Sequence, residues 1–122
     1  MTLIEQLRAW LQTMAATTGY AYSLGAWTED QTTGKVIALW NSGGRDVVEE
    51  EYPVFRIVLV GRRDTRADGL ELVTLADYIR TAAKASGCMG DTVRVKPIGG
   101  IVGPGYTAEG RAWVELNLEF LI

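Results

Sequence analysis

The sequence has no histidine and only one cysteine, Cys88, among its 122 residues. Without histidine, Ser-His-Asp and Cys-His catalysis are excluded, and the commonest protein ligand of transition metals is missing. A single cysteine can neither close an internal disulfide nor build a zinc site, so we expect Cys88 to be a structural thiol. We therefore expect no bound metal and no cofactor.

Long apolar runs and an excess of positive charge are missing as well. No apolar stretch approaches the ~20 residues that span a bilayer, and residues 1–5 lack the basic and apolar regions of a signal peptide. We expect synthesis in a cytosol and no membrane association. The net charge of −3 argues against a general nucleic-acid binder, because neutralising phosphates requires a basic face.

What is present is typical of one soluble globular domain spanning residues 1–122. Hydrophobic residues make up 48% of the chain and charged residues 22%, which are ordinary values. A chain of this length can bury a core without disulfides or metal.

Two helices are predicted from caps and apolar spacing. A capping box in Thr2–Glu5 precedes an apolar stripe at helical spacing, and this first helix is expected to fade by Thr17–Thr18 with Gly19 as its stop. The second helix is predicted from Asp68 or Leu70 to Ser86, with Gly87 as its stop.

Strand patterns occupy most of the remaining chain, at Tyr20–Trp27, Val36–Trp40, Tyr52–Val60, Asp91–Lys96 and Ala112–Ile122. The first two, joined by the polar segment Thr28–Gly34, suggest a hairpin, and Ser42–Glu51 is expected to be a loop. Pro97–Tyr106 resembles a phosphate-binding loop only superficially, because a strand and not a helix follows it. A bulged strand leading into a hairpin turn is the better interpretation.

This order predicts an α+β fold, a mostly antiparallel sheet of about four to five strands with two helices packed on one face. In Ala112–Ile122 every even position is apolar, so one face of this strand is expected to face the core. Tyr52–Val60 is apolar on both faces apart from Arg56. Either the sheet curls on itself or another subunit covers its second face.

Two charged clusters flank the Tyr52–Val60 strand at its opposite ends. One is acidic (Glu49, Glu50, Glu51) and the other basic (Arg62, Arg63, Arg66). A solvated acidic run is the plainer interpretation. The sharper hypothesis is that the two clusters meet between neighbouring subunits and set their register.

Several pieces taken together resemble the tail terminator, or tail completion, proteins of long-tailed bacteriophages. They are a strand with an embedded arginine (Phe55–Val60), an Arg/Asp turn, an alanine-rich helix (Leu72–Arg80) and a valine strand that enters a Gly/Pro segment (Val95–Gly100). A glycine and a polar turn then lead into the alternating C-terminal strand. The resemblance covers a little over half of the chain.

The resemblance implies a non-enzymatic protein of the virion, at the tail-head junction. It implies a hexameric ring on the end of the tail tube nearest the head, which stops tube polymerisation and joins the filled head. Its partners are then the major tail tube protein and a head-completion or connector protein, with DNA passing through the lumen without specific binding. We expect loops carrying Gly103, Pro104, Tyr106, Arg45 and Asp46 to dock on the tube or the head.

Two alternatives remain open. One is a neighbouring head-tail connector or neck protein of the same particle, which the sequence hardly separates from a terminator. The other is a small ligand-binding or enzymatic α+β domain, which needs convergent polar groups. Its best candidates are Asp77, Tyr78 and Glu115.

Overall fold

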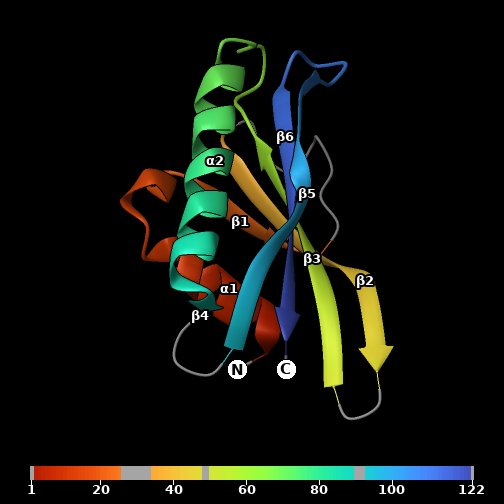
Figure 1. Ribbon diagram of the computed structural model, residues 1–122. Helices are drawn as coiled ribbons and strands as arrows, with labels where there is room; N and C mark the ends of the chain where they lie inside the picture. Colours follow the sequence, from red (N-terminus) through yellow and green to blue (C-terminus); the bar gives the residue numbers. More distant parts are fainter. Residues whose placement is uncertain (1, 26–33, 48–49, 90–92, 122) are drawn as a thin grey trace.

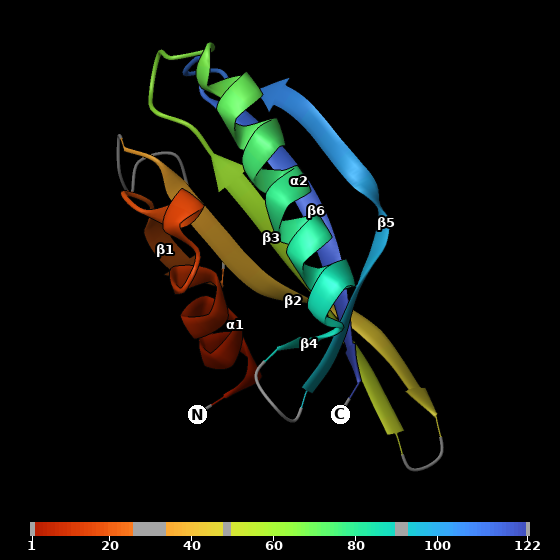
Figure 2. The same ribbon diagram turned by 60° about the vertical axis from the view of Figure 1, so that its left-hand side comes forward.

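The computed structural model describes residues 2–25, 34–47, 50–89 and 93–121 (Figure 1). These residues form an α+β domain of two α-helices, a short 3-10 helix and one curled, six-stranded mixed sheet. The elements are α1 (Leu3–Gln12), the 3-10 helix (Ala15–Thr17), β1 (Ala21–Leu24), β2 (Val36–Val47), β3 (Glu50–Val60), α2 (Asp68–Ser86), β4 (Cys88–Met89), β5 (Val93–Tyr106) and β6 (Ala112–Leu121). Both α-helices lie on the same face of the sheet (Figure 2).

The strand order is β1-β2-β3-β6-β5-β4, and every pairing is antiparallel except that of β1 with β2. The α+β class and the helix layer agree with expectation, but the described sheet has six strands and not four to five. The predicted hairpin of the first two strands is wrong, because Ala21 lies opposite Val36 and Leu24 opposite Leu39, a parallel register. Residues 28–33 of the loop expected between them lie outside the described residues.

The core lies between the helices and the inner face of the sheet. Its fully buried members include Leu7 and Leu11 of α1, and it continues through α2 and the central strands at Leu72, Ile79, Ile37, Leu39, Ile57, Leu59, Leu116 and Leu118. In β6 the predicted alternation is confirmed: the even positions from Ala112 to Phe120 are buried. The buried alternate positions of the strands and the apolar sides of the helices therefore form one apolar layer.

Local caps explain where the helices begin and end. At the start of α1, the Thr2 hydroxyl accepts from Glu5 N at 3.3 Å and Glu5 Oε1 accepts from Thr2 N at 3.3 Å, as the capping box predicts. The helix ends at Gln12, earlier than predicted. The Thr17 hydroxyl lies 2.9 Å from the carbonyl oxygens of both Leu11 and Met14, so its hydrogen supplements the backbone N–H bonds that these carbonyls accept where the helix ends.

The second helix has the predicted bounds. It runs from Asp68 to Ser86, and Gly87 follows it in the left-handed conformation with φ 65°. This conformation costs glycine little because glycine has no Cβ.

Strands β2 and β3 form a long hairpin whose outer part leaves the body of the domain. The segment predicted as a loop, Ser42–Glu51, is mostly strand. Asn41 Oδ1 accepts from Gly43 N at 2.8 Å, and the β2–β3 register shifts between Asn41 and Gly44, so the Asn-Ser-Gly-Gly segment is a bulge and not an end. Beyond it, residues 44–47 and 50–53 pair only with each other among the described strands; we call this two-stranded ribbon the β2–β3 arm (Figures 1 and 2).

Strand β5 is bulged, as predicted. Its register with β6 shifts between Ile98 and Val102 and again between Val102 and Gly105. On its other side, the described part of β4 pairs only with Val93 and Arg94. From Lys96 onward, β5 is an irregular sheet edge.

Candidate assembly surfaces

The first arginine of the predicted basic cluster, Arg62, is held by a carboxylate of its own subunit. Arg62 Nε donates to Asp68 Oδ2 at 3.0 Å and Nη2 donates to Oδ1 at 2.9 Å, while the Arg62 backbone N also donates to Oδ2 at 2.9 Å. Asp68 is buried in the first turn of α2. The hydrogen bonds from the guanidinium hold the pKa of the Asp68 carboxyl below its ordinary value.

The other two arginines also have partners in the same chain. Arg63 Nε lies 3.0 Å from Glu109 Oε2, and the Arg66 guanidinium lies 4.0 Å from the centroid of the Tyr106 ring. The basic cluster therefore joins the β3–α2 turn to the β5–β6 turn within one subunit. A contact between these arginines and the acidic cluster of a neighbour stays a prediction.

A residue that sequence reasoning missed, Arg111, anchors the same end of the molecule. Its side chain is fully buried. Nε donates to Gly61 O at 3.0 Å and Nη2 donates to Gly34 O at 2.6 Å, so one guanidinium joins segments before β2, after β3 and before β6. In the sequence Arg111 follows a polar turn and looks like any exposed cation, because its two acceptors are backbone carbonyls 50 and 77 residues away.

The residues expected in docking loops lie in strands. Gly103, Pro104 and Tyr106 belong to β5, not to a loop. Pro104 and the Tyr106 hydroxyl lie against Gly69 at the start of α2. Each is 3.4 Å from the position that a Cβ atom on Gly69 would take. The Tyr106 side chain nevertheless remains 42% exposed.

The remaining expected docking and interface residues belong to the hairpin of β2 and β3. Arg45 and Asp46 lie in β2, and Glu50 and Glu51 begin β3, where Asp46 is opposite Glu51. Glu49 lies outside the described residues. Arg45 and Asp46 are thus part of the β2–β3 arm rather than of a loop, and their docking role stays a prediction.

The face of the sheet opposite the helices, which we call the outer sheet face, is partly apolar. At one end, Val36, Ala38 and Val60 are buried. Beside them, Trp113 lies opposite Val60 and Val58 lies opposite Ala38. The side chains of Trp113, Val58 and Trp40 are only half-buried.

An ion pair crosses the middle of this outer sheet face. Arg56 Nε lies 3.2 Å from Glu115 Oε1, and the Arg56 guanidinium lies 5.5 Å from the centroid of the Trp40 ring. The face is therefore neither sealed within the subunit nor an open apolar surface.

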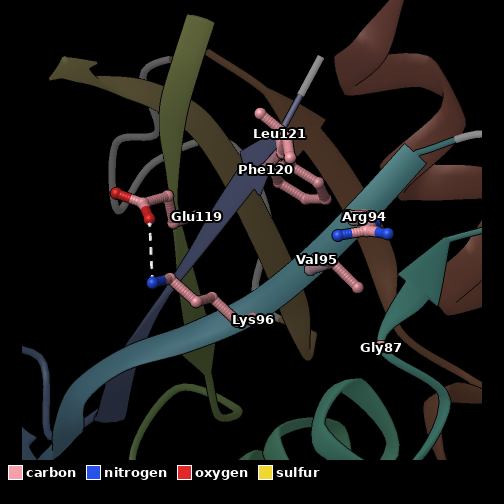
Figure 3. Close-up of a pocket in the computed structure, with 7 residues that line it drawn as sticks. All are labelled: Gly87, Arg94, Val95, Lys96, Glu119, Phe120 and Leu121. Atoms are coloured by element: carbon pink, nitrogen blue, oxygen red, sulfur yellow. Dashed lines mark ion pairs between the residues drawn. The ribbon is translucent and has the colours of Figure 1, made fainter. Parts of the chain in front are cut away.

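A pocket opens where β5 crosses the end of β6 (Figure 3). This β5 pocket has a volume of about 240 Å³ and is lined by Gly87, Arg94, Val95, Lys96, Glu119, Phe120 and Leu121. Lys96 Nζ lies 3.4 Å from Glu119 Oε1, whose side chain is nearly buried. Arg94 is exposed on the neighbouring stretch of the strand. The pocket thus combines apolar walls with a cationic rim.

The three candidates for an enzymatic site do not converge. Asp77 and Tyr78 lie on the exposed side of α2, above the inner face of the sheet, whereas Glu115 lies on the outer sheet face and pairs with Arg56. Tyr78 instead lines an open apolar hollow of about 600 Å³ with Leu70, which is 79% exposed.

The described residues contain no group of three or more acidic or cysteine side chains placed to hold a metal ion. None of the helices in the described part of the chain has the length and apolar character needed to cross a membrane.

Comparison with known proteins gives one family. The family model described as phage tail termination protein matches residues 1–122, which is the whole chain. No curated protein matches it.

Proposed function

Because the chain belongs to the phage tail termination protein family, we propose that it forms a ring on the end of the tail tube nearest the head. The ring ends tube polymerisation and offers the surface to which the filled head binds. The protein is a component of the virion, and its role is structural rather than enzymatic.

The observation that carries this proposal is the extent of the family match. It spans every described helix and strand, so the similarity to the family covers the whole fold and not one segment. A tail terminator acts by binding its neighbours, and the fold offers surfaces suited to that: a half-buried outer sheet face with two tryptophans, a protruding arm and a pocket with cationic rim.

A ring requires that two different surfaces of one subunit meet in its neighbour. The outer sheet face and the β2–β3 arm are distinct surfaces of the same subunit, which satisfies this requirement. The net charge of −3 also suits a protein through whose ring DNA slides, because a negatively charged protein has little attraction for phosphates.

The direct test is a tube-length assay. The tail tube protein of the same phage is polymerised with increasing amounts of this protein, and tube lengths and tube ends are measured by negative-stain electron microscopy. We expect shorter tubes that carry a ring of density at one end, and no further growth when fresh tube protein is added. Tubes of unchanged length at saturating protein would contradict the proposal.

A neck or connector protein of the same particle gives a different result in that assay. It would bind filled heads in a pull-down experiment while leaving tube growth unlimited. Measuring head binding and tube capping on one preparation therefore separates the two roles.

A further inference from the structure

The starting observation is the open apolar hollow on the helix side of the domain, which we call the helix hollow. Its walls come from α2 and from the 3-10 helix: Ala16, Ala67, Leu70, Glu71, Thr74, Leu75 and Tyr78. Leu70 and Tyr78 are both exposed, so two large side chains of one helix meet solvent at the same hollow. Exposed apolar side chains that gather in this way mark an interaction surface, whereas scattered ones do not.

The outer sheet face presents apolar side chains of its own. Val102 of β5 is 49% exposed and lies opposite Glu115 of β6. Side chains of directly opposite residues share one face of a sheet, so Val102 lies on the outer sheet face together with Val58, Trp40 and Trp113. The helix hollow and the outer sheet face are on opposite sides of the domain, so they meet only between two copies of the chain.

The exposed charges of the outer sheet face are mainly positive. In the pair Lys96–Glu119 the lysine side chain is 65% exposed and the carboxylate side chain only 10%. In the pair Arg56–Glu115 the arginine is again the more exposed partner. Arg94 is exposed on the same stretch of β5 as Lys96. The surface therefore offers cations to a partner, while its carboxylates are largely covered.

The rim of the helix hollow has the opposite arrangement. Glu71 Oε1 lies 3.0 Å from Lys35 Nζ, but here the carboxylate side chain is 50% exposed and the lysine side chain 25%. Asp77, the neighbour of Tyr78, is exposed as well. The exposed cation of this helix, Lys84, lies six residues beyond Tyr78, about 9 Å along the helix axis. The two surfaces are therefore complementary in charge, and both are partly apolar.

The two surfaces also lie at the same level of the domain and have similar lengths. The start of α2 lies against the end of β5, which pairs with Trp113 at the start of β6. From Leu70 to Tyr78, α2 rises about 12 Å. Strand β6 rises about 13 Å from Trp113 to Asn117, which lies in one cross-strand row with Trp40.

Both views show α2 lying along β6 (Figures 1 and 2). Each copy that binds the next one through these surfaces therefore stays at the same height along the strands. A head-to-tail contact without such a rise closes into a ring, whereas one with a rise continues as a helix.

We propose that the helix hollow of one subunit receives the outer sheet face of a second copy of this chain. Leu70 and Tyr78 contact Val102 and the half-buried tryptophans of the neighbouring subunit, and the carboxylate of Glu71 faces the neighbour's exposed cations. The inference rests on the proposed ring and names the contact that holds its subunits together.

Substitutions of the wrong sign, used alone and mixed, test this contact. Leu70→Lys places a cation in the helix hollow, and Val102→Glu places a carboxylate on the outer sheet face. Because both positions are exposed, we expect both variants to be folded, which circular dichroism and thermal unfolding establish. Ala108, exposed in the turn between β5 and β6, supplies controls of both signs, Ala108→Lys and Ala108→Glu.

Association is measured by light scattering in solution and by negative-stain imaging of tube ends. Each variant alone should associate at least about tenfold more weakly than the wild type. An equimolar mixture should recover at least pairs of wild-type affinity, because the intact outer sheet face of the Leu70→Lys chain meets the intact helix hollow of the Val102→Glu chain. Both Ala108 controls should assemble like the wild type.

Cysteine cross-linking locates the contact within complete rings, including rings that form only on tube ends. In a Cys88→Ser background, Thr74→Cys in the helix hollow and Val102→Cys on the outer sheet face are made singly and together. A short thiol-specific linker should give a ladder of covalent multimers only in the chain that carries both, since the contact joins two different surfaces. Ser86→Cys, at the far end of α2, should give no ladder when it replaces Thr74→Cys.

Each other outcome has a definite meaning. Wild-type assembly of the Leu70→Lys variant, a mixture that stays monomeric where the wild type associates, or no ladder from the chain with both cysteines overturns this contact while the ring itself stands. Covalent multimers from a chain with one cysteine do the same. Absence of wild-type rings both in solution and on tube ends overturns the proposed function.

Discussion

The Arg62–Asp68 pair should make the stability of this protein depend on pH, and Asp68→Asn isolates that dependence. The substitution keeps the size of the side chain and one acceptor oxygen but removes the charge. The carboxylate accepts three hydrogen bonds of 2.9–3.0 Å, two of them from the guanidinium. A hydrogen bond to a charged group contributes about 1.5–3 kcal/mol, so we expect a loss of about 2 kcal/mol at pH 7.

The sign of the pH effect follows from the direction of the pKa shift. The folded state lowers the pKa of Asp68, chiefly through the hydrogen bonds from Arg62. The unfolded chain therefore binds the proton more readily, and the stabilisation is fully present above the unfolded pKa of about 3.9. It is lost as the pH falls through that value towards the lowered pKa of the folded state.

Urea unfolding of wild type and Asp68→Asn from pH 7 to pH 3 measures both effects. We expect a gap in the free energy of unfolding of about 2 kcal/mol at pH 7 that narrows as the pH falls below the unfolded pKa of Asp68. Asp77→Asn, which removes an exposed carboxylate from the same helix, is the matched control and should stay close to wild type. A gap that is missing at neutral pH, or one of constant size across the series, would refute the reasoning.

Three further substitutions test other parts of the fold, each by urea unfolding. Arg111→Met leaves the carbonyls of two segments without their buried donor and should cost about 3 kcal/mol; a variant as stable as wild type would contradict the anchoring role. Gly105→Ala forces a methyl group into the Trp113 indole and should cost about 1–3 kcal/mol, whereas Gly100→Ala, which meets open space, should cost less. Thr2→Ala removes the capping box of α1 and should cost about 1 kcal/mol; no loss would mean that the cap is not formed in solution.

The elements that follow from local chemistry could be predicted closely. The capping box at Thr2, the left-handed Gly87 after α2 and the alternation in β6 each depend on neighbours a few residues away, and the structure confirms all three. The end of α1 could not be predicted, because Thr17, whose hydroxyl bonds to carbonyls after the last turn, looks like an ordinary helix residue in the sequence.

The pairing of distant segments was harder to predict. Asn41–Gly44 has the composition of a turn, yet the structure uses it as a bulge, and β2 continues beyond it to form the arm. The parallel pairing of β1 with β2 is also unexpected, since a short polar connection usually indicates a hairpin.

The partners of the charged residues at the candidate interface were equally hard to predict from the sequence. The sequence identifies Arg62, Arg63 and Arg66 as a basic cluster, but their partners Asp68, Glu109 and Tyr106 are a matter of tertiary structure. Likewise, Arg94 and Lys96 read as the solvated side of a short strand, and only the fold shows that Leu121 and Glu119 lie beside them. Composition located the charges, and only the fold revealed their partners.

The irregular edge of β5 has a consequence for how this protein behaves at high concentration. Consecutive hydrogen bonding to an incoming strand requires evenly spaced N–H and C=O groups, and two bulges together with the prolines at 97 and 104 interrupt that spacing. Fibrous stacking of one molecule on the next through this edge is thereby discouraged. The thioflavin fluorescence of a concentrated solution should therefore not rise over days. Unassembled subunits then remain available for assembly instead of forming amyloid.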